Sequence, residues 1–184
     1  KTDKRTQINF GYYYSYGFKQ TIGGKEVKKP KGLLKPEEVE VEPMPSWMEE
    51  ISDRLIKEGV ITEADRPDSA LINLYPPEKG AIPPHVDHAN FDRPVITIRF
   101  KNPVDMDFGY KAGSKDATGT FRSSYTRKSA QQQKSNIDPF SVELGVGEVH
   151  VMSGEAANNT THAIFQDSLP DDGWSYSITL RQVK

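Results

Sequence analysis

Residues 69–100 read SALINLYPPEKGAIPPHVDHANFDRPVITIRF, and the fold can be predicted outward from this stretch. Side chains alternate with a two-residue period over residues 69–75 and again over residues 95–100, as expected of short β-strands. Prolines and a glycine separate the two runs, and no long helical pattern lies between them. This arrangement argues against a parallel α/β sheet, in which a crossover helix would join the strands.

Three further strands are predicted downstream, at residues 141–144, 148–152 and 175–181. A helix followed by many short strands favours a mainly β fold with a flanking helix, either a double-sheet barrel or a jelly roll. The chain has 184 residues, which is typical of one domain and enough to bury a core. We therefore expect a single domain over residues 1–184, with the helix and the β core in residues 46–184.

The predicted helix begins at Ser46 and stops at Gly59. Ser46 and Glu49 have the spacing of a capping box, in which each side chain bonds a backbone amide at the helix start. Apolar residues recur every four positions on one face, which we expect to pack against a sheet. This face consists of Trp47, Ile51 and Leu55.

Two polar regions flank or interrupt this pattern. Residues 1–45 are predicted to contain an N-terminal strand within residues 8–18, INFGYYYSYGF, which is broken by Gly11 and Gly17. Residues 19–45 are rich in Lys, Gly, Pro and Glu and are interpreted as an exposed loop. A second polar stretch, at about residues 111–139, is interpreted as a flexible insert between two strands.

Composition excludes several classes of protein. The chain has no cysteine, so disulfide scaffolds, cysteine-ligated metals and thiol nucleophiles are excluded. No apolar run approaches the roughly 18–20 residues that a membrane-spanning helix needs. The formal net charge of −2 argues against binding nucleic acid by bulk charge, although a local basic groove remains compatible with it. The sequence begins at Lys1, so we expect targeting signals to lie outside it.

The motif H-x-D at His85 and Asp87 supplies two candidate metal ligands. On an extended strand, residues two apart point to the same face. An imidazole and a carboxylate, joined by a second imidazole from elsewhere, form the triad that binds Fe(II) and leaves positions open for a co-substrate and O2. His162 follows the predicted strand at residues 148–152 and is the candidate third ligand, supplied by a loop. The alternative is a solvated histidine in a surface turn.

Two of the predicted strands carry unusual polar faces. The upstream strand places Asn73 and Tyr75 on one face, just before the H-x-D motif. The last strand has four polar residues on one face, Ser175, Ser177, Thr179 and Arg181. An arginine that points inward needs an anionic partner, because burying an unpaired charge is costly. A dicarboxylate co-substrate would supply that partner.

N-x-Y, H-x-D, a distant histidine and S-x-T-x-R, in this order, resemble the AlkB family of Fe(II)/2-oxoglutarate-dependent dioxygenases. The phrases FGYYYSY, PMPSW, INLYPPEKGAIPPHVDH, RPVITIRF and GEVHVMSGEA extend the resemblance over most of the chain. The sequence looks most like the eukaryotic, plant-like members that demethylate N6-methyladenosine in RNA. The resemblance implies a double-stranded β-helix (jelly-roll) fold with an N-terminal nucleotide-recognition lid, and we expect a location in the nucleus or cytoplasm.

The resemblance also implies roles for individual residues. The implied iron ligands are His85, Asp87 and His162. The implied 2-oxoglutarate contacts are Asn73, Tyr75, Ser177 and Arg181. Two other histidines receive no role, because His88 is expected to turn away from Asp87 and His150 is interpreted as an ordinary strand residue.

The chain departs from the family at Ser175, six residues before Arg181, where a second arginine usually pairs with the distal carboxylate of 2-oxoglutarate. Serine is neutral and too short for that contact. The co-substrate site is either lost or rebuilt, with Arg99 of the neighbouring strand pointing into the vacated space. The last alternative places Arg99 on the outer face of the sheet, paired with Asp105 or Asp107.

The face opposite Arg99 should be apolar. Thr97 shares the face of Arg99, whereas the other side of this strand is expected to pack against the helix. Its residues are Ile96, Ile98 and Phe100.

The implied reaction is oxidative demethylation of N-methylated bases in nucleic acid, releasing formaldehyde, succinate and CO2. A base inside a duplex cannot reach a buried iron, so a single strand is expected, with RNA favoured over DNA. Tyrosines stack bases and lysines contact phosphates. The candidates are Tyr12, Tyr14, Lys28 and Lys29. The structural alternative is that these tyrosines pack in the core and the lysines lie in a solvated loop.

Two alternative functions remain. The chain is either a silent AlkB-like domain that binds RNA or a protein, or a protein hydroxylase.

Overall fold

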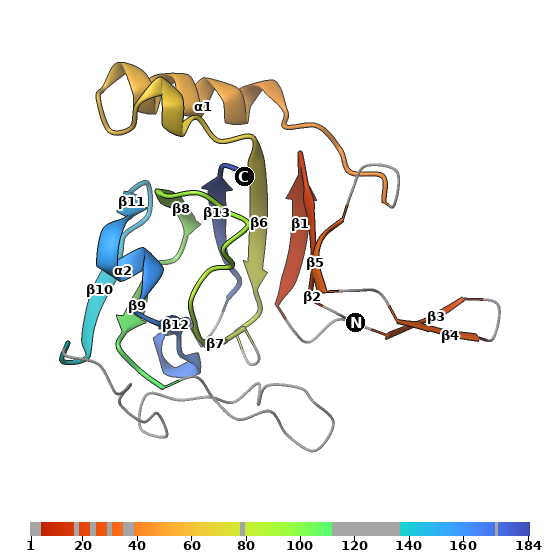
Figure 1. The fold of residues 1–184 in the computed structure, drawn as a ribbon. Helices are drawn as coiled ribbons and strands as arrows, with labels where there is room; N and C mark the ends of the chain where they lie inside the picture. The colour runs from red at the N-terminus through yellow and green to blue at the C-terminus, as the bar shows by residue number, and fades with distance from the viewer. Residues whose placement is uncertain are drawn as a thin grey trace.

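Two antiparallel sheets form the body of the protein in the computed structural model (Figure 1). The described residues are 5–16, 19–22, 25–28, 31–34, 39–77, 80–111, 137–171 and 173–184. In spatial order, the five-stranded sheet consists of β1 (Thr6–Phe10), β6 (Ser69–Tyr75), β13 (Ser175–Arg181), β8 (Val95–Lys101) and β11 (Val149–Met152). The four-stranded sheet consists of β10 (Phe140–Leu144), β9 (Val104–Phe108), β12 (His162–Ile164) and β7 (Ile82–His85).

The space between the sheets contains one of two apolar clusters. Tyr75 and Val95 contribute to it from the five-stranded sheet, and Met106, Phe108 and Ile164 contribute from the four-stranded sheet. The predicted jelly-roll architecture, mainly β with a flanking helix, is therefore confirmed. All five strands predicted from residue 69 onward are present, and the prediction missed three short ones, β7, β9 and β12.

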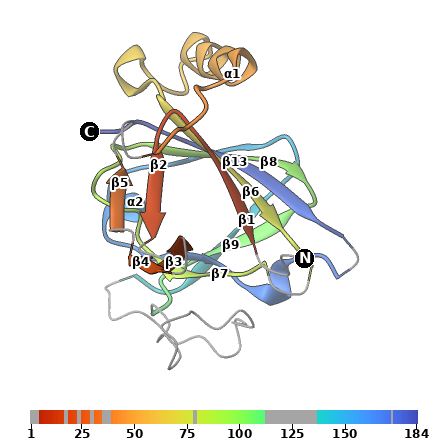
Figure 2. The same ribbon diagram turned by 90° about the vertical axis from the view of Figure 1, so that its right-hand side faces the viewer.

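The outer face of the five-stranded sheet is covered by α1 (Ser46–Lys57), the helix seen above the strands in Figures 1 and 2. Met48 and Leu55 of α1 are buried against apolar side chains that include Ile96 and Ile178. The predicted buried face was therefore partly wrong, because Trp47 is 43% exposed and Met48 takes its place. Trp47 lies one position round the helix from the side that meets the sheet.

The ends of α1 agree only in part with the prediction. The helix begins at Ser46, but Pro45 occupies the N-cap position and no side chain caps the helix, so the predicted capping box is wrong. A capping box is present instead in the following 3-10 turn (Glu63–Asp65). Gly59 adopts a φ of +72°, and the amide of Val60 bonds the carbonyl of Leu55 at 2.9 Å, so the predicted stop is confirmed.

Met48→Ala tests how strongly α1 is bound to the sheet. Met48 has no exposed surface, so the substitution should leave a cavity and lower the free energy of unfolding by about 2–5 kcal/mol. Urea denaturation measures this difference. The matched control is Glu49→Ala, which should change the free energy of unfolding by only about 0.5 kcal/mol, because Glu49 is exposed and caps nothing. Equal losses in both variants would show that α1 does not pack as described.

The N-terminal region contains more strands than predicted. β2 (Tyr13–Tyr16) pairs with β5 (Lys31–Leu34), and β3 (Lys19–Ile22) pairs with β4 (Lys25–Lys28). These two small sheets lie on one side of the body in Figure 1. The exposed loop predicted for residues 19–45 is therefore wrong over β3, β4 and β5, because lysine-rich sequences also form two-stranded ribbons.

The remaining parts of the chain are the predicted insert and two short helical segments. Residues 112–136, most of the predicted insert, lie outside the described residues. Two further helical turns are short, α2 (Gly154–Asn158) and a 3-10 turn (Gln166–Ser168). No helix within the described ranges is long and apolar enough to cross a membrane.

The register of the five-stranded sheet separates its two faces. Ile178 of β13 lies opposite Ile72 of β6 and Ile98 of β8, and these residues face α1. Ser177, the next position, lies opposite Asn73 and Arg99. Because alternate residues of a strand point to opposite faces, the polar row lines the space between the two sheets.

Candidate metal centre and co-substrate site

Strand pairing in the four-stranded sheet brings the triad together. His85 is the last residue of β7 and His162 is the first residue of β12, and the two are direct partners in the antiparallel register. Asp87 follows two residues after His85. The potential ligand atoms of these three residues all lie within 4.8 Å of one another. The sequence-predicted triad is thus assembled, although His162 lies in a strand and not in a loop.

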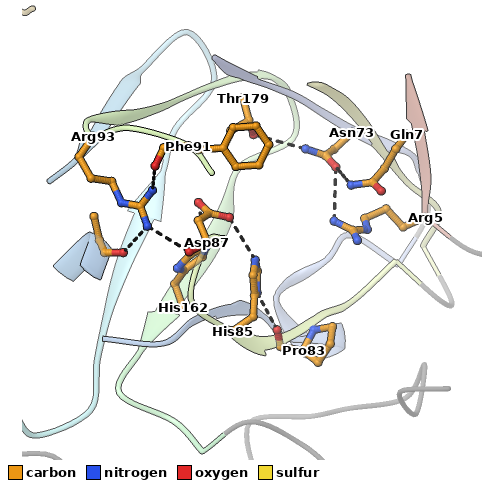
Figure 3. Close-up of polar contacts among 11 residues, drawn as sticks. Arg5, Gln7, Asn73, Pro83, His85, Asp87, Phe91, Arg93, His162 and Thr179 are labelled. Atoms are coloured by element: carbon orange, nitrogen blue, oxygen red, sulfur yellow. Dashed lines mark hydrogen bonds and ion pairs between the residues drawn. The ribbon is translucent and has the colours of Figure 1, made fainter. Parts of the chain in front are cut away.

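The donor atoms converge on one point (Figure 3). His85 Nε2 lies 3.7 Å from Asp87 Oδ1, and His162 Nε2 lies 3.9 Å from Asp87 Oδ2. The carbonyl of Pro83 lies 2.9 Å from His85 Nδ1, which is therefore the protonated nitrogen that donates to it. His85 Nε2 is then left with its lone pair directed toward the other two donors, as a metal ligand requires.

The charges of the triad also suit a metal. Burial lowers the pKa of His85, and burial together with His85 lowers the pKa of His162 to about 4. Burial alone would raise the pKa of Asp87, but the attraction of His162 and His85, aided by Arg181 and Arg93, outweighs it and lowers that pKa. At neutral pH the site therefore offers two neutral imidazoles and one carboxylate, a donor set that fits Fe(II).

Arg93 holds the loop that carries Asp87, and no role was predicted for it from the sequence. Its Nη2 donates to the carbonyls of Asp87 and Ala157, each at 3.1 Å, and its Nη1 donates to the carbonyl of Phe91 at 2.7 Å (Figure 3). One guanidinium thus ties the Asp87 loop to the end of α2. The bonds go to backbone atoms, so no residue pattern in the sequence indicates them.

Arg93→Met should weaken metal binding without removing a ligand. The loss of three backbone contacts frees the Asp87 loop, and disturbing groups that orient metal ligands typically lowers affinity by roughly 10–100-fold. Calorimetric titration with the metal measures the change in affinity. Arg54→Met is the matched control, because the side-chain contact of Arg54 among the described residues is an exposed ion pair with Glu58 on α1. An unchanged metal affinity in Arg93→Met would contradict this positioning role.

A cavity at the triad is lined by His85, Asp87 and His162. Polar residues of the five-stranded sheet also line it: Asn73, Tyr75, Thr97, His150, Thr179 and Arg181. Asn73, which is 3% exposed, accepts from Gln7 Nε2 at 3.1 Å and Arg5 Nη1 at 3.4 Å (Figure 3). The structure therefore places this predicted 2-oxoglutarate contact at the cavity, together with two side chains of the N-terminal strand region that the sequence prediction missed.

Tyr75, Ser177 and Arg181 also occupy the predicted face. The hydroxyls of Tyr75 and Ser177 lie 3.2 Å apart and share a hydrogen bond. Arg181 is 4% exposed, lines the same cavity as Asp87, and has its guanidinium 3.8 Å from the centre of the Phe91 ring. Hydroxyl, amide and guanidinium donors thus surround the space next to the triad, as binding of an anionic co-substrate requires.

Arg99 points inward, so the outer-face alternative is wrong. Its side chain is 1% exposed, and its Nη1 donates to Ser175 Oγ at 2.7 Å. On the opposite face, Ile96 and Ile98 are buried as predicted. Phe100 is 47% exposed, which corrects the expectation that it packs against α1.

The remaining predicted residues lie at different places. His88 is exposed and faces the ring of Tyr14 at 5.2 Å, which confirms that it turns away from the triad. Tyr14 is 5% exposed and also contacts Phe91, so it takes the alternative packing role instead of offering a stacking surface. Tyr12 is half-buried. The side chain of Lys28 and the whole of Lys29 lie outside the described residues.

His150 lies in β11, as predicted, and its side chain faces the cavity. It lies opposite Thr97 in the register of β11 and β8, and both side chains line the cavity. Its Nε2 is buried and has no hydrogen-bond partner among the described residues. The alternation of β11 puts His150 on the inner face, and this signal was available in the sequence.

Comparisons with known proteins agree with this geometry. The family model of the 2OG-Fe(II) oxygenase superfamily matches residues 23–175. RNA demethylase ALKBH9B of Arabidopsis thaliana is 32% identical over 160 residues, which make up 87% of this chain and 27% of that protein. RNA demethylase ALKBH5 of Xenopus tropicalis is 32% identical over 163 residues, covering 87% of this chain and 39% of that protein. The chain thus spans well under half the length of these curated relatives.

The solved structure of OsALKBH1 has the same fold, with a TM-score of 0.55 at 14% identity, over 97% of this chain and 78% of that one. The superfamily description names 2-oxoglutarate and Fe(II), and the His85, Asp87 and His162 donor set fits that metal. With a family match over most of the chain, this protein belongs to the 2OG-Fe(II) oxygenase superfamily, as a member of its AlkB family.

Proposed function

We propose that this domain catalyses the Fe(II)- and 2-oxoglutarate-dependent oxidative demethylation of N-methylated bases in nucleic acid. N6-methyladenosine in single-stranded RNA is the proposed substrate, and formaldehyde, succinate and CO2 are the products. One observation carries the proposal: three metal donors lie within 4.8 Å of one another at a cavity that Asn73, Tyr75 and Arg181 also line. The preference for RNA is supported by relatives that are named RNA demethylases.

In this proposal one set of residues binds the metal and another set binds the co-substrate. His85, Asp87 and His162 hold Fe(II), while Asn73, Tyr75, Ser177 and Arg181 bind and orient 2-oxoglutarate in the adjoining cavity. Bound there, Fe(II) together with O2 and 2-oxoglutarate would supply the oxidising chemistry that hydroxylates the N-methyl carbon, so that this carbon is lost as formaldehyde. The protein needs no acid–base pair of its own for this reaction, because its task is to position the methyl group and exclude water.

The base must enter from a single strand or be flipped out of a duplex. Tyr12 is the proposed stacking residue, because it is half-buried, whereas Tyr14 is buried against the rings of His88 and Phe91. Lys28 and Lys29 are the proposed phosphate contacts. Aromatic stacking and backbone contacts of this kind suit single strands and need no sequence specificity.

The direct test is turnover on a panel of methylated single-stranded oligonucleotides. Mass spectrometry should detect loss of a methyl group, coupled to succinate release, with N6-methyladenosine RNA demethylated faster than the matching DNA. An Asp87→Ala variant on the same panel is the control for contaminating activity. Succinate release with peptides but not with oligonucleotides would favour a protein hydroxylase. RNA binding without any turnover would favour a silent domain, and either result would overturn the proposal.

A further inference from the structure

Arg99 is a buried cation without an acidic partner in the part of the chain that the structure describes. Among the described residues, its guanidinium forms one hydrogen bond, to a neutral acceptor, Ser175 Oγ, at 2.7 Å, and its buried Nε and Nη2 have no hydrogen-bond partner there. Burial lowers the pKa of Arg99, which shows that its charged form is poorly solvated here. A buried charge of this kind is costly unless an anion joins it.

The surroundings of Arg99 suit a carboxylate. Its guanidinium carbon lies 5.1 Å from the centre of the Tyr75 ring, and the Tyr75 hydroxyl lies 3.2 Å from Ser177 Oγ. Ser177 is also the direct partner of Arg99 in the register of β13 and β8. Two hydroxyls and the free edge of a guanidinium are therefore gathered beside Tyr75, which lines the cavity that contains the triad.

Ser175 positions the Arg99 side chain, and its small size leaves room for the guanidinium. It donates to the carbonyl of Lys101 at 2.9 Å while it accepts from Arg99, so it fixes the Arg99 side chain to the end of β8. A larger residue at position 175 would compete with the guanidinium for the same space, because Ser175 itself has no exposed surface. The two residues thus act as a matched pair on neighbouring strands.

We propose that Arg99, held by Ser175, binds the distal carboxylate of 2-oxoglutarate together with the hydroxyls of Tyr75 and Ser177. This inference rests on the proposed function, because it assumes that the other end of the co-substrate lies at the triad. The positive charge for the distal carboxylate then comes from β8, and Arg181 of β13 is left for the end of the co-substrate nearer Asp87.

Keto-acid selectivity tests the proposal without relying on turnover. Calorimetry on the Mn(II)-loaded protein measures the dissociation constants of 2-oxoglutarate and of 2-oxopentanoate, which has the same chain length but a methyl group in place of the distal carboxylate. The wild type should prefer 2-oxoglutarate. In Arg99→Ser, loss of a charge-assisted bond should reduce this preference by roughly 10–150-fold, while the affinity for 2-oxopentanoate changes little.

Two variants separate a charge contact from a structural role. Moving the charge, in the double variant Arg99→Ser/Ser175→Arg, should restore most of the preference for 2-oxoglutarate. Arg99→Lys keeps the charge but loses the planar fork, so it should lie between Arg99→Ser and the wild type. Mn(II) affinity reports whether each variant is folded, and Arg99→Lys carries the test if Arg99→Ser does not fold.

The outcomes distinguish this proposal from the proposed function. Equal weakening of both keto acids in Arg99→Ser or Arg99→Lys, with selectivity unchanged, would overturn the role of Arg99 and leave the oxygenase assignment standing. A wild-type protein that binds Mn(II) but neither keto acid would overturn both. A lost preference in Arg99→Ser that the double variant restores would support the relocated charge.

Discussion

Asp87→Ala should lower Fe(II) affinity and turnover by more than roughly 100-fold, because even groups that only orient metal ligands contribute roughly 10–100-fold. Asp87 supplies the single carboxylate of the triad, with oxygens 3.7 Å and 3.9 Å from the two histidine nitrogens. Its removal also leaves two neutral imidazoles with no negative charge to balance a divalent ion. Anaerobic Fe(II) titration and succinate release measure the two effects.

Asp92→Ala is the matched control for Asp87→Ala. Asp92 lies in the same segment, but its side chain is 45% exposed and pairs with Lys184 at 3.3 Å. Fe(II) affinity should therefore be unchanged in this variant, because surface ion pairs contribute little. Similar losses of affinity in both variants would show that the whole loop, and not the Asp87 carboxylate, determines metal binding.

Arg181→Met should raise the dissociation constant of 2-oxoglutarate by about 100-fold or more, because a guanidinium can form two charge-assisted bonds to one carboxylate. Methionine keeps much of the buried stem, so packing against Phe91 is largely retained while the charge is lost. Calorimetry on the Mn(II)-loaded protein measures the change. The dissociation constant of Arg181→Lys should lie between those of the wild type and Arg181→Met, because lysine keeps the charge but cannot form the two parallel hydrogen bonds of a guanidinium.

Arg66→Met is the control for a general effect of charge removal. Arg66 pairs with Glu63 at 2.5 Å and with Asp53 at 2.8 Å on the surface, and it does not line the cavity. Its substitution should leave 2-oxoglutarate binding unchanged. An unaltered dissociation constant in Arg181→Met would refute the assignment of Arg181 to the co-substrate.

The strands that could be predicted are those in which side chains alternate between clear breaks in the sequence, such as β6 and β13. β6 and β13 begin and end where the pattern predicts. β7 was missed because Ile82–His85 contains two prolines, which are usually excluded from strands. β12 has only 3 residues, too few for any period to be recognised.

In the site, too, features that depend on residues near in sequence could be predicted, whereas features that depend on strand pairing could not. The spacing of His85 and Asp87 is a local pattern, so their shared face could be predicted. The pairing of His85 with His162 depends on the register of β7 and β12, and before the fold is known only the family resemblance indicates it. Arg93 could not be predicted, because its contacts are to backbone carbonyls contributed by Asp87, Phe91 and Ala157.

The departure at Ser175 was visible in the sequence, but its consequence was not. Strand alternation placed Arg99 on the face of Thr97 and left open whether that face was inside or outside the barrel. The structure decides this point, because Arg99 is 1% exposed and reaches Ser175 across the β8 and β13 pair. Burial of a long cationic side chain depends on the packing of both sheets, which no local pattern specifies.

Anaerobic titration of Fe(II) and 2-oxoglutarate into the purified protein tests most directly whether His85, Asp87 and His162 form an iron centre. Chelation of iron by the keto acid should produce a weak visible charge-transfer band that saturates at one iron per chain, and the His162→Ala variant should lack it. A protein that develops no such band, or a His162→Ala variant that develops it at full intensity, would contradict the assignment.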